Sequence, residues 1–193
     1  MFISKLVERA VAIQFIFHCD ANDLLPTRQS AHWHLHSTES AVLVIYNDII
    51  RAVDQGHVVA MALLDLNSAF DTVDHATLPS VLRQRHAVTG QGLVWSQSYL
   101  TYQNQIVVTD SSRSLPFTLS SGVPQGSCLG STQFITYTDD TTDIFPNYSI
   151  QYHLFADNAQ MYDHCPVSSD VPDLINHLSP CFKQCLMPPI VCS

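Results

Sequence analysis

Two aspartates that lie far apart in the chain have neighbours that favour metal chemistry. Asp65 directly follows the apolar run 58–64. Asp157 lies in the segment 154–162, where apolar residues lead into the turn Phe155–Asn158 and then away from it. This second pattern is typical of a tight β-hairpin with a carboxylate at its tip. We expect Asp65 and Asp157 to lie on adjacent strands and to share a metal ion.

The acidic residues after Asp65 leave a second interpretation open. A buried strand that ends in an acid is costly unless that acid has a partner. Asp65 could instead cap a helix that begins after it, with Asp71 and Asp74 on a solvated face. Both interpretations stand at this point.

Another acidic pair, Asp139 and Asp140, follows Tyr137 in the order Tyr-x-Asp-Asp. We reject this pair as the catalytic turn. It comes off a helical pattern and leads into the polar residues 141–143, which cannot form a returning apolar strand. The turn at Asp157 has apolar arms on both sides, as the metal-site geometry requires.

The surrounding sequence predicts a mixture of helices and strands. The run 58–64 predicts a strand buried on both faces. Helical spacing of apolar residues predicts helices at 1–17, 75–85, 91–102 and 170–186. A further helix is expected to begin at Ser37 and to end at Gly56, and another to follow a cap at Ser127. Further strands are expected at 105–108 and 115–119, joined by a turn at 110–113.

Composition limits the function classes that fit. The 193 residues suffice for one domain, or one and a piece. The net charge is −9, from 8 Lys plus Arg against 17 Asp plus Glu. Binding of nucleic-acid phosphates requires cations, so this balance argues against a strong nucleic-acid interface. The longest apolar stretch near the start, 10–17, is too short to span a bilayer.

The six cysteines form no Cys-x-x-Cys pair and there is no secretion signal, so we interpret them as free intracellular thiols. We therefore expect the chain inside the cell, in the cytoplasm, with access to the nucleus within a ribonucleoprotein. His32, His34 and His36 would share one face of an extended segment and could bind zinc. The simpler interpretation is a polar-faced strand or loop.

In several of these stretches the chain resembles the reverse transcriptases of non-long-terminal-repeat retrotransposons, the jockey-type and related LINE-like elements. The similarity runs from about residue 6 to about residue 185. It rests on the stretches Gln29–Ala31, His36–Glu39, Leu64–Leu66 with Ala69–His75, Gly122–Ser127 and Phe155–Asp157. The third and fourth, in that order and separated by two helices and a hairpin, are highly specific.

The resemblance implies an α+β fold with the palm and part of the fingers of a right-hand polymerase, and with the thumb absent. It implies one partial reverse transcriptase domain over residues 1–193. Within it, 1–57 would be a fingers-like helical part, 58–165 the palm with the catalytic motifs, and 166–193 a truncated tail. By the same resemblance, we expect the endonuclease usually found upstream to be missing.

The resemblance further implies RNA-directed DNA polymerase activity with an RNA template, a DNA primer and deoxynucleotides. Two divalent ions, Mg²⁺ or Mn²⁺, would activate the primer 3′ oxygen and stabilise the leaving pyrophosphate. Asp65 and Asp157 would be the shared metal ligands, and Asn158 occupies the next position of the catalytic turn. No membrane and no protein partner is implied.

Four other residues take substrate-binding roles by the same resemblance. Leu66 would lend its backbone carbonyl, and Phe70 matches the bulky residue that blocks a ribose 2′-OH. Gln125 and Gly126 match the loop that contacts the template and the incoming nucleotide.

Two substitutions depart from the family pattern. Asn158 replaces the second Asp of the turn, which removes a charge beside a divalent ion. Trp33 replaces an Arg that meets the incoming triphosphate, and Trp lacks both its charge and its forked donors. The departures keep alternatives open. One is a catalytically inactive remnant with at most weak nucleic-acid binding, and the other is a folded scaffold with neither role.

Overall fold

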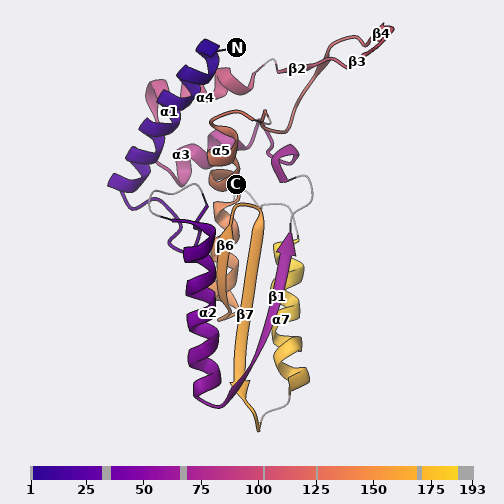
Figure 1. Cartoon of the computed structure of the whole chain (residues 1–193). Coiled ribbons are helices and arrows are strands. Elements are labelled where there is room, and N and C mark those ends of the chain that lie inside the picture. The colour runs from indigo at the N-terminus through magenta and orange to yellow at the C-terminus, as the bar shows by residue number, and fades with distance from the viewer. Residues whose placement is uncertain are drawn as a thin grey trace. The chain divides into compact units, whose positions relative to one another are not determined.

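Distant parts of the sequence combine into two compact units in the computed structural model (Figure 1). One unit combines residues 1–24 with 68–137, and the other combines 25–67 with 138–193. The residues that the structure describes are 2–31, 36–65, 69–101, 103–124, 126–168 and 171–186. Helices and antiparallel strands both contribute, so the fold class is α+β as predicted.

The second unit is built on a three-stranded sheet in the order β1-β7-β6, in which both strand pairs are antiparallel. The strands are β1 (His57–Asp65), β6 (Gln151–Phe155) and β7 (Asn158–Pro166). The helical elements of this unit are α2 (Thr38–Asp54), η2 (Asp139–Asp143), α6 (Ile144–Asn147) and α7 (Val171–Cys185). The predicted hairpin at 154–162 is thereby confirmed.

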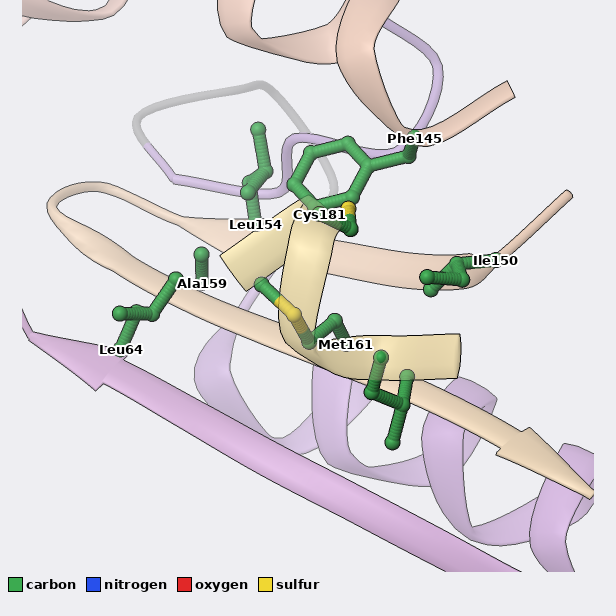
Figure 2. Close-up of a cluster of buried hydrophobic side chains, with 8 residues drawn as sticks. Leu64, Phe145, Ile150, Leu154, Ala159, Met161 and Cys181 are labelled. Carbon is green, nitrogen blue, oxygen red and sulfur yellow. The ribbon is translucent and has the colours of Figure 1, made fainter. Parts of the chain in front are cut away.

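One face of this sheet packs on α7 to form the core (Figure 2). Leu64, Ala159 and Met161 from the strands join Leu178 and Cys181 from α7 in the buried cluster. Burying such side chains stabilises the fold by about 25 cal/mol for each Å² removed from water. The helix predicted at 170–186 is therefore confirmed, and apolar residues on one of its faces pack on the sheet.

The prediction that the first strand is buried on both faces was wrong. Met61 is 42% exposed and Leu63 is 68% exposed. Successive strand residues point to opposite faces, so these two point away from the face that packs on α7. The helix α2 lies on their side, where the Asp48 carboxylate accepts a hydrogen bond from Tyr162, but it leaves Met61 and Leu63 open to solvent.

The start and end of α2 confirm the predicted signals. Ser37 is the N-cap: its side chain accepts a hydrogen bond from the Ser40 backbone N–H, and the Ser40 Oγ accepts one from the Ser37 backbone N–H. Gly56 follows the C-cap with φ of +76°, a conformation that glycine adopts without strain.

The first unit is largely helical. Its helices are α1 (Phe2–Ala21), η1 (Ala69–Asp71), α3 (Leu78–Gln84), α4 (Gly90–Leu100) and α5 (Gly130–Tyr137), and its strands are β2 (Asn104–Gln105), β3 (Val108–Thr109), β4 (Ser112–Arg113) and β5 (Phe117–Thr118). No helix within the described ranges is both long and apolar enough to cross a membrane.

The predicted strands at 105–108 and 115–119 occur only as fragments. β2 pairs with β5 and β3 pairs with β4, each over two residues. All eight strand residues are exposed, so no buried face supports longer pairing. Pro116 between β4 and β5 also lacks a backbone donor for a ladder.

Candidate functional site

One end of the three-stranded sheet brings the predicted catalytic residues together. Asp65 is the last residue of β1, and its register partner is Asn158, the first residue of β7. Asn158 also pairs with Phe155 across the hairpin, so Ala156 and Asp157 form the two-residue turn. Asp65 therefore belongs to a paired strand, and Asp157 is one residue from its cross-strand partner.

These side chains are open to solvent, as a substrate site requires. Asp65 and Asn158 are exposed and Asp157 is half-buried. Cross-strand partners in an antiparallel sheet have Cβ atoms about 5 Å apart, so Asp65 and Asn158 are within reach of one ligand. The sheet end offers two carboxylates and one amide oxygen.

This donor set fits a magnesium-like ion. Mg²⁺ prefers oxygen ligands and is usually bound by one or two carboxylates together with waters and substrate phosphates. Within the part of the chain that the structure describes, no group of three or more His, Cys, Asp or Glu side chains could hold a metal ion. A site with only Asp65 and Asp157 therefore depends on the substrate for its remaining ligands.

A network of polar side chains links β7 to α2 in the same unit as the site. The Tyr162 hydroxyl donates to Asp48 Oδ2 at 2.6 Å, and Arg28 Nη1 lies 3.8 Å from the same oxygen. Burial, and then the neighbouring Asp48 carboxylate, raise the pKa of Tyr162 well above its usual range. No local sequence pattern indicates this network, because its members are 20 or more residues apart in the chain.

The other predicted segments meet in the first unit. The Gly122 backbone N–H donates to the Val73 carbonyl at 2.8 Å, and the Val123 N–H donates to the Phe70 carbonyl at 2.9 Å. His75 Nε2 lies 2.6 Å from the Gly122 carbonyl oxygen. The stretch 69–75 and the loop 120–127 are therefore joined by hydrogen bonds, although they are about 50 residues apart in the sequence.

Phe70 and Gly126 lie within this structure. The Phe70 ring is half-buried and its centroid is 5.2 Å from that of Phe134 in α5. Gly126 has φ of +75°, and a Cβ there would meet nothing within 4 Å. The predicted cap of the next helix is confirmed, because Ser127 Oγ accepts a hydrogen bond from the Gly130 N–H at 2.8 Å.

Several predictions fall outside the described residues. These concern Leu66 and Gln125, as well as Trp33, His32 and His34. Their assigned roles stay predictions. The rejection of Asp139 and Asp140 as the catalytic turn is supported, because η2 places both in a 3₁₀ helix with Asp139 buried.

Gly122 provides a test of the contact between the two segments. It has φ of +92°, and an added Cβ would lie 3.4 Å from Asp71 Cα. We expect Gly122→Ala to lower the free energy of unfolding by about 2 kcal/mol, because alanine is strained at this φ and its Cβ would touch the Asp71 backbone. Gly126→Ala has open space and should cost about 1 kcal/mol. Urea unfolding followed by fluorescence measures both, and equal losses would contradict the close approach.

Comparisons with known proteins show which sequences this chain is similar to. A family profile described as "Reverse transcriptase (RNA-dependent DNA polymerase)" matches residues 1–185. The probable RNA-directed DNA polymerases from transposons X-element and BS of Drosophila melanogaster are each 30% identical over 138 residues. The RNA-directed DNA polymerase from mobile element jockey of the same species is 25% identical over 138 residues.

Each of these alignments covers 72% of this chain and 15% of the relative. The chain therefore spans about 15% of the length of the curated relatives it matches. The predicted resemblance to reverse transcriptases of jockey-type elements is confirmed.

Proposed function

Because this chain belongs to the reverse transcriptase (RNA-dependent DNA polymerase) family, we propose that the end of the β1-β7-β6 sheet is its nucleotide-transfer site. The observation that supports this most is the register of β1 on β7, which places Asp65 beside the turn that carries Asp157. The longer protein would copy an RNA template into DNA from a primer and deoxynucleotides. In this proposal the sheet is the core of the palm.

The carboxylates of Asp65 and Asp157 would hold the divalent ions, Mg²⁺ or Mn²⁺, two of them by family resemblance. When bound, such ions polarise phosphate oxygens and lower the pKa of a coordinated hydroxyl. Asp65 and Asp157 bring negative charge to a solvent-open sheet end, which favours a cation bound to nucleotide phosphates. Asn158 contributes a neutral oxygen opposite Asp65.

The substrate-binding roles of four other residues rest on family resemblance alone. Phe70 would exclude a ribose 2′-OH, and Gly126 would let the backbone approach the template and nucleotide, since it carries no side chain. Leu66 and Gln125 complete the proposed set by family resemblance.

One feature favours a second candidate function, an inactive remnant of the fold. Asn158, rather than a third carboxylate, faces Asp65. The net charge of −9 also opposes binding of nucleic acid. A protein of this kind would keep the sheet without the reaction.

Primer extension distinguishes the two functions. The purified chain is mixed with an RNA template, a DNA primer, deoxynucleotides and Mg²⁺. We expect templated extension that chelation of the metal stops and that Asp157→Asn abolishes. Asp54→Asn is the control, because Asp54 is exposed at the end of α2 that precedes β1, away from Asp65. Absence of extension with both Mg²⁺ and Mn²⁺ would favour the remnant.

A further inference from the structure

A buried glutamine contacts the turn that carries Asp157. Gln29 is only 3% exposed. Its Oε1 accepts hydrogen bonds from the backbone N–H groups of Ala156 and Ala31, both at 3.0 Å. Its Nε2 donates to the Ala156 carbonyl at 3.3 Å. One side-chain amide therefore satisfies both backbone groups of Ala156.

Ala156 needs such support because of its conformation. Its φ is +54°, in the left-handed region. An L-residue with a Cβ is disfavoured in this region, and the first position of such a two-residue turn usually holds glycine or asparagine. Ala156 directly precedes Asp157, so its conformation sets where the Asp157 carboxylate points.

The backbone around Gln29 is fixed to the same hairpin. The Leu154 N–H donates to the Arg28 carbonyl at 2.7 Å, and the Ser30 N–H donates to the Leu154 carbonyl at 2.9 Å. These bonds form a parallel bridge between Gln29 and Leu154. Ser30 Oγ also lies 2.8 Å from His153 Nε2. The backbone hydrogen bonds of Arg28 and Ser30 thus fix the chain on both sides of Gln29.

We propose that Gln29 is a positioning residue that holds Ala156 in its left-handed conformation and so fixes Asp157 beside Asp65. Its consequence for metal binding rests on the function proposed above. An amide suits this task because it offers a donor and an acceptor on one planar group, which match the C=O and N–H of one residue. A carboxylate lacks the donor, and an aliphatic side chain lacks both.

Hydrogen exchange of the Ala156 amide, followed by NMR, tests the contact without any reaction. In Gln29→Leu we expect this amide to exchange at least roughly tenfold faster relative to the amide of Met161 in the middle of β7. Gln133→Leu is the matched control, because Gln133 is also a buried glutamine but belongs to α5 in the other unit. Equal exchange of the Ala156 amide in the two variants would overturn the proposal. If Gln29→Leu does not fold, Gln29→Met is measured instead, since it keeps the length of the side chain and removes both the amide donor and the amide oxygen.

A second substitution separates positioning from general stability. Ala156→Gly removes the cost of the left-handed conformation. If Gln29 acts through that conformation, Gln29→Leu should weaken Mn²⁺ binding several-fold, and adding Ala156→Gly should recover most of the loss. A loss that Ala156→Gly leaves unchanged would contradict this action. If the unmodified chain binds no Mn²⁺ but Gln29→Leu still exposes the Ala156 amide, the function proposed above fails and the positioning of the turn stands.

Discussion

Asp65→Asn is expected to lower the affinity of the chain for Mn²⁺ by roughly one hundredfold. Two unit charges about 4 Å apart interact by about 4 kcal/mol at an effective dielectric constant near 20. Asp65 is exposed at the end of β1, so water screens part of this attraction. We therefore expect a loss of about 2.8 kcal/mol, which corresponds to the hundredfold change. The substitution keeps the size of the side chain, so the register of β1 on β7 should survive.

Calorimetric titration with Mn²⁺ measures this change. Asp54→Asn removes the same charge from the same unit at the end of α2 and should leave the affinity unchanged. Circular dichroism of both variants establishes that the fold persists. Equal affinities of the two variants would show that the metal binds elsewhere or only through diffuse charge.

Asn158→Asp is expected to have opposite effects with and without metal. Without metal, two carboxylates would face each other across β1 and β7. Like charges at such a cross-strand pair destabilise by roughly 0.2–1 kcal/mol, so the melting temperature should fall slightly. With Mg²⁺ or Mn²⁺ the added charge should raise metal affinity about tenfold to a hundredfold, stabilise the chain by mass action and increase primer extension.

Thermal unfolding at several Mg²⁺ concentrations shows whether Asn158→Asp lowers the melting temperature without metal and raises it with metal. Asn147→Asp serves as the control, since Asn147 is exposed at the end of α6 and belongs to the same unit. A melting temperature that Mg²⁺ raises equally in the two variants would contradict a metal site at Asn158. If the affinity rises but primer extension does not, the missing activity lies outside the turn.

The hairpin and the end of the first strand were predictable because local patterns specify both. Apolar arms on both sides of Asp157 distinguish its turn from Asp139 and Asp140, whose flanking residues are helical. The same logic gave Ser37 and Gly56 as the limits of α2. In each case one turn or cap carries the information within a few residues.

Features that depend on distant packing were not predictable in this way. The apolar run 58–64 reads as buried on both faces, but Met61 and Leu63 are exposed because the second face of the sheet is only partly covered. The contact of Gln29 with Ala156 joins residues 127 apart in the sequence. The residues next to Gln29 in the sequence do not indicate that its side chain contacts the turn at Ala156.

Paramagnetic broadening by Mn²⁺ tests the central claim most directly, because it reports the position of the ion and not only its affinity. Asp65 and His57 lie at opposite ends of β1, which spans roughly 26 Å at 3.3 Å per residue. At low Mn²⁺ concentration we predict that the amide signals of Leu64 and Ala159 broaden first, and that Asp65→Asn removes this effect. Broadening centred instead on His57 and His164, whose Nδ1 atoms lie 2.9 Å apart at the other end of the sheet, would contradict the proposed site.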